Sequence, residues 1–208
     1  ANIVLLDENS NKIDQTPFTI ETDTIKISVP ISKKKVVSLK TVFLNAPDIY
    51  QIDPIACTLS ENLITIIGPP ETVDAIESIS LAPIDFKNIS PDNRSFDVAL
   101  QLPTAVKSVD NIKYITVAIN VDNMITKQFN VFTFTSVNLA SGLNVSLPSS
   151  IKNVKICGPA SIVKRISAND LYAEIDLSGK SAGEFTMPAK IKCRSSGEVW
   201  AVGQYDVI

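Results

Sequence analysis

The chain has no histidine among its 208 residues, and this absence excludes several common kinds of active site. Histidine is the usual general base near neutral pH, a frequent zinc and copper ligand, and the partner of serine or cysteine in nucleophilic pairs. The chain has only seven glycines, and neither a Walker-type loop nor a dinucleotide-binding glycine motif occurs. The sequence therefore predicts a protein that is not an enzyme and that holds no cofactor and no metal.

Runs of basic residues and long apolar runs are scarce as well. The net charge is −3 and the pI is near 5.0, which disfavours a nucleic-acid binder because such a protein needs a basic face. Lys33-Lys34-Lys35 is the only basic run, and we interpret it as a solvated hairpin tip or charged edge, with a site for anionic partners as the alternative. No apolar run approaches the roughly 20 residues that cross a bilayer, and no signal peptide is present.

Cysteine is the third scarce residue, with only Cys57, Cys157 and Cys193. Three cysteines are too few for a disulfide framework. We expect all three to be small, mostly buried apolar side chains. A bond between Cys157 and Cys193 remains the alternative.

The feature that organises the chain is a repeat. Residues 64–76 recur ninety positions later as residues 154–166, and after a one-residue insertion Ala82-Pro83-Ile84-Asp85 recurs as Ala173-Glu174-Ile175-Asp176. A long fixed period indicates that one structural unit has been copied. The apolar, glycine and proline residues that recur are Ile66, Gly68, Pro69, Val73 and Ile76, which become Ile156, Gly158, Pro159, Val163 and Ile166.

Each copy has the pattern of a strand, a turn, one short helix and a second strand. Alternating apolar residues predict the first strand. We expect Gly68 to end it where the chain bends, because glycine adopts positive φ freely, and Pro69 to take the first helical position. Val73 and Ile76 then lie three apart on one helical face.

The abundance of threonine, valine and isoleucine favours strands over long helices, so the predicted fold class is mainly β. We expect two tandem domains, at residues 24–123 and 124–208, each a small twisted β-sheet or barrel-like unit. Residues 1–23 are expected to form an N-terminal hairpin, either the end of a preceding repeat or an extra edge of the first. Because no Pro- or Gly-rich linker separates the copies, we expect a stiff arrangement.

Few side chains are candidates for a site. Asp85 and Asp176 follow equivalent strands, and an aspartate there is expected to accept backbone N–H bonds and stabilise the turn rather than to form a catalytic pair. Asp7, Glu8 and Asn9 suggest calcium only weakly, and a solvated turn is the preferred interpretation. A sugar-stacking platform is weighed against ordinary packing for the scattered aromatic residues, which are Tyr50, Tyr114, Tyr172, Trp200 and Tyr205.

The ordered set of motifs resembles the YbbR repeat family. The second copy reads Ile156-Cys157-Gly158-Pro159, then Val163 and Ile166, then Ile175-Asp176-Leu177-Ser178-Gly179. The first copy lacks Ser-Gly after Asp85, and residues 25–31 resemble the opening of the repeat. The positions expected to carry the structural motif are Gly68, Pro69, Val73, Ile76, Asp85, Gly158, Pro159, Val163, Ile166, Asp176 and Gly179.

The resemblance implies a non-catalytic regulatory module on the extracytoplasmic face of a bacterial membrane. Members of the family typically carry an N-terminal transmembrane helix, which this chain lacks, and the best understood ones regulate a membrane diadenylate cyclase that makes cyclic di-AMP. The cyclase is therefore the expected partner, and nucleic acid is not expected. An adhesin or glycan-binding β module is the alternative. An RNA-binding role, suggested by the family's fold similarity to a ribosomal protein domain, is disfavoured by the acidic balance.

Overall fold

The computed structural model describes residues 4, 6–14 and 31–208, which belong to two units, residues 1–31 and 32–208. In the first unit, Leu6 and Lys12 form an isolated antiparallel bridge. The carboxylate of Asp7 closes the intervening turn by accepting the backbone N–H groups of Asn9 and Asn11 at 2.9 and 2.8 Å. The Asn11 N–H is the main cause of a lowered Asp7 pKa. Of residues 25–31, which resemble the opening of the repeat, all but Ile31 lie outside the described residues.

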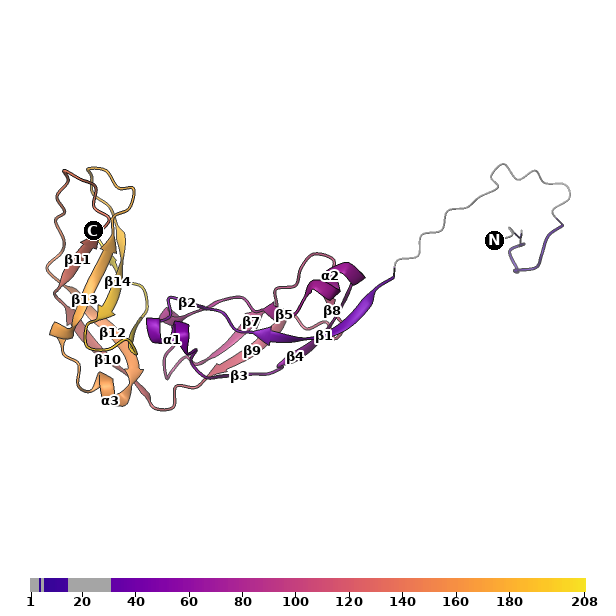
Figure 1. The fold of residues 1–208 in the computed structure, drawn as a ribbon, viewed down its shortest axis with the longest axis horizontal. Coiled ribbons are helices and arrows are strands. Elements are labelled where there is room, and N and C mark those ends of the chain that lie inside the picture. Colours follow the sequence, from indigo (N-terminus) through magenta and orange to yellow (C-terminus); the bar gives the residue numbers. More distant parts are fainter. Residues whose placement is uncertain (1–3, 5, 15–30) are drawn as a thin grey trace. The chain divides into compact units, whose positions relative to one another are not determined.

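The second unit consists of short strands and three short helices, so the mainly β prediction is confirmed (Figure 1). The first repeat contains β1 (Lys33–Lys40), β2 (Phe43–Leu44), α1 (Asp48–Ile52), β3 (Cys57–Leu59), β4 (Leu63–Gly68), α2 (Pro70–Ala75), β5 (Ser78–Ser80), β6 (Ile84–Asp85), the 3-10 helix η1 (Phe86–Asn88), β7 (Ser95–Ala99), β8 (Lys107–Ser108) and β9 (Tyr114–Ile119).

The second repeat contains β10 (Met124–Val131), β11 (Phe134–Val137), β12 (Ile151–Pro159), α3 (Ala160–Val163), the 3-10 helix η2 (Ala168–Asp170), β13 (Leu171–Asp176), β14 (Met187–Cys193), β15 (Trp200–Val202) and β16 (Asp206–Val207). The exact limits of the two predicted domains, 24–123 and 124–208, stay a prediction.

The strand pairing shows how closely the two repeats correspond. β1, β4 and β8 are neighbours in one sheet, and β10, β12 and β15 have the same order in another. The register matches: Lys33 pairs with Gly68 as Ile125 pairs with Gly158, and the parallel pair β2–β6 matches β11–β13. One module has therefore been used twice, and residues of these paired strands can be assigned counterparts in the other copy.

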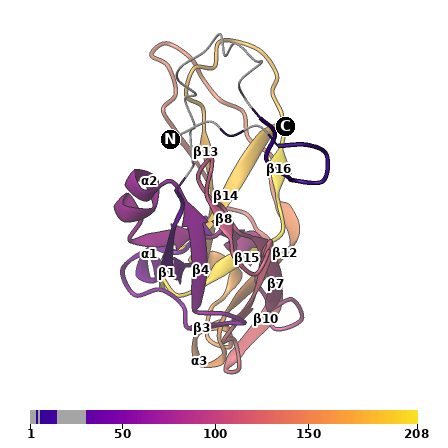
Figure 2. The same cartoon turned by 90° about the vertical axis from the view of Figure 1, so that its right-hand side faces the viewer.

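Alternation along the strands separates an inner from an outer face of each sheet. In β4, the inner residues Ile64 and Ile66 are buried while Leu63 is exposed. The helix α2 lies beside β1 and β4 (Figure 2) and its Val73 is fully buried, as is Val163 of α3. Each repeat thus has a core of its own, and a third cluster of buried residues continues from the first repeat into the second.

The reason expected for Gly68 and Gly158 is wrong. Neither has a positive φ, and both lie within strands. A Cβ on Gly68 would approach the Ala105 carbonyl oxygen to 3.0 Å, and one on Gly158 would approach Val199 Cγ1 to 2.7 Å. Glycine is needed there because the neighbouring segment of the sheet packs directly on its backbone.

This close packing gives a measurable prediction. The change Gly158→Ala is expected to lower the free energy of unfolding by about 1–3 kcal/mol, because the added methyl must displace Val199 or the adjoining backbone. Gly197→Ala is the matched control, since nothing lies within 4 Å of a Cβ at that position. Urea denaturation of both variants measures the difference, and equal stabilities would contradict the packing explanation.

The prolines lie one residue earlier than expected. Pro69 and Pro159 are the N-cap residues of α2 and α3, with ψ of 137° and 133°, so the helices begin at Pro70 and Ala160. An extended ψ still belongs to the preceding strand, which explains the displacement. Ile76 is the C-cap of α2 and packs against the core of the first repeat. Its counterpart Ile166 lies just after α3 and is buried.

All three cysteines are free thiols, so the alternative of a Cys157–Cys193 bond is not realised. Cys157 is fully buried, whereas Cys57 and Cys193 are partly exposed. Burial raises the pKa of the Cys157 thiol to about 11.

Candidate interaction site

A matched asparagine–aspartate pair lies at one end of each repeat. The Asn45 side-chain amide donates to Asp85 Oδ2 at 2.8 Å, and the Asn138 amide donates to Asp176 Oδ1 at 2.8 Å. Both asparagines have positive φ, 52° and 59°, a conformation that asparagine tolerates better than most residues. The pairs join the ends of parallel strands, β2 to β6 and β11 to β13.

Each aspartate also holds the turn that follows it. Asp85 accepts the backbone N–H of Lys87 at 2.9 Å, and Asp176 accepts both the backbone N–H and the hydroxyl of Ser178 at 2.9 and 2.6 Å. The Ser178 hydroxyl, followed by the Asn138 amide, lowers the pKa of Asp176. Gly179 has a φ of 69°, where glycine avoids strain.

Sequence reasoning selected the aspartates and missed their asparagine partners. The signal was present, because Asn45 precedes Asp85 by 40 residues and Asn138 precedes Asp176 by 38. An alignment of the two copies upstream of residue 64 would have shown it.

The junction between the repeats is built around Trp200. This side chain from β15 is only 4% exposed, and its indole N–H donates to the Ile89 carbonyl at 3.0 Å. Its ring packs edge-on against Phe86 and Tyr50 of the first repeat, with centroid separations of 5.1 and 5.9 Å. A backbone–backbone hydrogen bond, from the Gly203 N–H to the Lys87 carbonyl at 2.8 Å, adds to the junction.

The aromatic residues do not form one platform. Trp200 and Tyr50 do come together, although 150 positions separate them, but they cover each other. Tyr114 is exposed on β9, while Tyr172 lies under the Arg194 guanidinium, 5.1 Å from its ring centroid. The Tyr205 hydroxyl donates to the Val202 carbonyl. Apart from the Trp200–Tyr50 pair, these aromatic residues lie at separate places, so they do not form a platform on which a sugar could stack.

The basic run is part of strand β1 rather than a hairpin tip. Lys33 forms an ion pair with Asp74 at 2.5 Å, and Lys35 donates to the carbonyls of Asp74 and Ile76 at 3.1 and 2.7 Å. Positive charge at the C-terminal end of α2 satisfies carbonyls that the helix leaves unpaired. Lys34 lies on the opposite, outer face of the sheet and is exposed.

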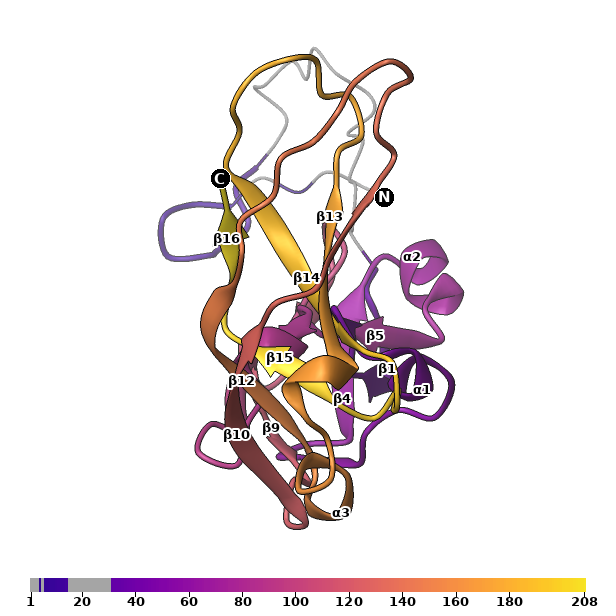
Figure 3. The same ribbon diagram turned by 90° about the vertical axis from the view of Figure 1, so that its left-hand side faces the viewer.

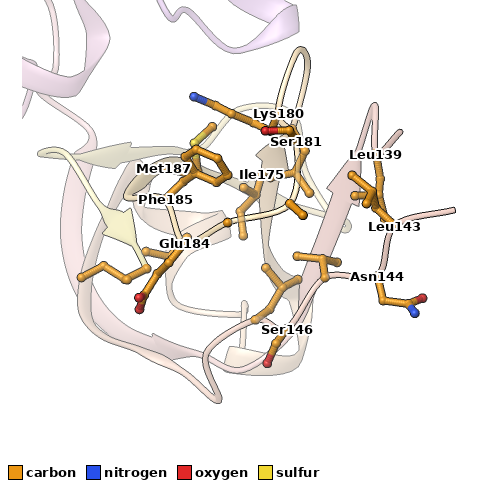
Figure 4. Close-up of a pocket in the computed structure, with 17 residues that line it drawn as sticks. Leu139, Leu143, Asn144, Ser146, Ile175, Lys180, Ser181, Glu184, Phe185 and Met187 are labelled. Atoms are coloured by element: carbon orange, nitrogen blue, oxygen red, sulfur yellow. The ribbon is translucent and has the colours of Figure 1, made fainter. Parts of the chain in front are cut away.

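A cavity of about 460 Å³ opens beside the Asn138–Asp176 pair, and most of its lining comes from the connections that follow β11 and β13 (Figure 4). Figure 3 shows the long connection between β13 and β14. Leu139 and Leu143 lie on one side of it, and Lys180 and Phe185 on the other. The Lys180 ammonium lies over the Phe185 ring at 4.9 Å. The lining is largely apolar with one charge of each sign, Lys180 and Glu184. Such a lining can bind a side chain or a protein surface.

Residues 4, 6–14 and 31–208 contain no group of three or more Cys, Asp or Glu side chains placed to hold a metal ion. Within the same described part of the chain, no helix has the length and apolar character required to cross a membrane.

A curated relative and two solved structures were found by comparison with known proteins. The chain is 24% identical over 209 residues to the CdaA regulatory protein CdaR of Bacillus subtilis (strain 168), covering 98% of this chain and 42% of that protein. The chain therefore spans less than half of the length of this relative. A solution structure of SuR18C from Streptococcus thermophilus is 23% identical, covers 45% of this chain and 89% of the other, and has a TM-score of 0.31.

A crystal structure of a YbbR-like protein from Streptococcus pneumoniae is 14% identical over 89% of this chain and 96% of the other, with a TM-score of 0.29. The family model described as YbbR-like protein matches residues 37–122 and 132–199, one match in each repeat and most of the chain in total. On this evidence, the chain belongs to the YbbR-like protein family, as the repeated motifs indicated.

Proposed function

We propose that this chain is a non-catalytic regulatory module that acts on the extracytoplasmic face of a bacterial membrane and modulates a membrane diadenylate cyclase, and with it the level of cyclic di-AMP. The observation that carries the proposal is the similarity to the CdaA regulatory protein CdaR, which extends over 98% of the chain.

The junction supports a role in which the repeats act as one body. Trp200 is inserted among the aromatic residues of the first repeat, and a shared cluster of buried side chains continues across the boundary. We therefore expect a displacement of one repeat to move the other with it, because motion between the repeats would expose the indole ring and break its hydrogen bond. This is the property that a relay between an envelope signal and a membrane enzyme requires.

The glycan-binding alternative has less support. It depends on exposed aromatic rings, and Trp200, the strongest candidate for sugar stacking, is buried at the junction.

The test is to express the cyclase in a host that makes no cyclic di-AMP, alone and together with the complete membrane-anchored protein that contains this chain. We expect the nucleotide level to change severalfold when the regulator is present. The Trp200→Ala variant should lose most of this effect at equal expression, and Tyr114→Ala, at an exposed site away from the junction, should keep it. Cyclic di-AMP that stays the same with and without the regulator would refute the proposal.

A further inference from the structure

The cavity of the second repeat is built from the counterparts of residues that seat Trp200 in the first repeat. Counterpart residues can be assigned from the strand pairing, because Leu44 pairs with Asp85 in the first repeat as Val137 pairs with Asp176 in the second. In the first repeat, the cluster around Trp200 includes Ala46, Tyr50, Phe86 and Ile89. Their counterparts are Leu139, Leu143, Leu177 and Lys180, and all four line the cavity.

The backbone around Trp200 in the first repeat and the backbone at the cavity of the second repeat correspond as well. Ile89 N–H donates to the Phe86 carbonyl at 3.0 Å, and Lys180 N–H donates to the Leu177 carbonyl at 3.1 Å. The Ile89 carbonyl receives the Trp200 indole N–H, so the Lys180 carbonyl is its counterpart in the second repeat. We call the cavity with this carbonyl the socket of the second repeat.

The other half of the junction also has a counterpart, on the outer face of the first repeat's sheet. Cys157 pairs with Trp200 just as Ile67 pairs with Lys107, so Lys107 stands in the place of the tryptophan. Lys107 is exposed, and Ile67 is half-buried. Two further apolar side chains are exposed on the same outer face: Val36 of β1 is 60% exposed, and Leu63, the first residue of β4, is 58% exposed. We call this surface the outer face of the first repeat.

We propose that the socket of the second repeat binds the outer face of the first repeat of a second copy of this chain, so that copies associate head to tail by repeating the internal junction. Both halves of that junction have counterparts on the chain. Among the described residues, Leu139 of the socket and Val36 and Lys107 of the outer face are exposed, while Leu177 forms the buried floor of the socket. Lys107 can donate to the Lys180 carbonyl as Trp200 donates to the Ile89 carbonyl. The socket contributes one charge of each sign, and Lys107 is expected to approach Glu184 rather than the Lys180 ammonium, which lies over the Phe185 ring. An interface between two different surfaces of one chain does not close, so short open oligomers form.

The residue at position 107 determines how strong this association is. A lysine buries less apolar area than the tryptophan that occupies the equivalent place within the chain, so the association of the natural chain is weak and concentration-dependent. Lys107→Trp places on the outer face a tryptophan equivalent to Trp200. Buried tryptophans contribute much of the binding energy at protein interfaces. We expect this variant to associate at least about tenfold more tightly.

Sedimentation velocity over a concentration series tests the proposal. The unsubstituted 208-residue chain should show a weight-average sedimentation coefficient that rises with concentration. Leu139→Glu, in the exposed wall of the socket, and Lys107→Glu, on the outer face, should each remove this rise. Tyr114→Glu, a charge placed at an exposed site on β9 outside both surfaces, should leave it unchanged.

Mixing the two disabled variants gives the decisive result. Each variant keeps the half that the other has lost, so an equimolar mixture should form dimers through one intact interface and nothing larger. Circular dichroism and melting curves verify that each variant is folded. The proposal would be overturned if the unsubstituted chain and a folded Lys107→Trp variant both stay monomeric. A dimer formed by a chain that carries both Leu139→Glu and Lys107→Glu would overturn it as well.

Discussion

Replacing Trp200 by alanine is expected to lower the free energy of unfolding by about 3–5 kcal/mol and to divide a single unfolding transition into two. The indole ring is 4% exposed between Phe86 and Tyr50, so its removal leaves a large cavity at the junction. The Ile89 carbonyl also loses its donor. Because each repeat has a further core of its own, the repeats should then unfold independently.

Calorimetry and urea denaturation monitored by circular dichroism measure the loss of stability and the number of unfolding transitions. Tyr114→Ala is the control, because that aromatic side chain is 65% exposed and its loss should cost less than about 1 kcal/mol. A Trp200→Ala variant that unfolds in one transition, with stability close to the natural chain, would show that the junction does not couple the repeats.

The Cys157 thiol is expected to be alkylated at least about 100-fold more slowly in the folded chain than in the denatured chain at pH 8. The thiolate is the reactive form, and burial both blocks access to the sulfur and raises its pKa to about 11. Mass spectrometry of the modified peptides follows each cysteine separately, and Cys193, partly exposed, serves as the internal reference. Trp200→Ala should accelerate labelling of Cys157, because the two residues pair across neighbouring strands at the junction.

The same thiol predicts how stability depends on alkaline pH. The folded state holds the proton more tightly than the unfolded state, whose thiol has a pKa near 9.0. The contribution to stability is therefore complete below about pH 9 and decreases as the pH rises toward 11. Cys157→Ala should flatten this part of the profile, and an equally steep profile in that variant would contradict the assignment.

Several predictions from sequence hold because they depend on local periodicity. Apolar residues alternate along β9 as expected of a strand, with Ile115 and Val117 fully buried on one face. The repeated helices appear where the Gly-Pro pairs indicated, within one residue. Asp176 holds the turn expected of it. Each of these depends on residues that are close in sequence, so the pattern alone carries the information.

Other predictions failed because the cause lies in a distant segment. Gly68 and Gly158 fit the repeated pattern, yet the reason for glycine is the backbone of residues 105 and 198–199 packing on them. Trp200 is far in sequence from Ile89 and Tyr50, and nothing in the spacing indicates that these three residues meet. Lys33 and Lys35 look like a free basic run until α2 is placed beside them.

The sequence by itself determined that the protein is mainly β, that one module occurs twice and that the module is of the YbbR type, because hydrophobic alternation and an ordered motif are properties of a one-dimensional pattern. Only the tertiary structure decided what fills the end of each module. Phe86 and Tyr50 pack against Trp200, whereas their counterparts Leu177, which is buried, and Leu143, which is partly exposed, line a cavity. The physical reason is that burial depends on which surfaces meet in space. Two repeats with the same motif therefore differ at this end, because Trp200 packs on one of them and a cavity opens at the other.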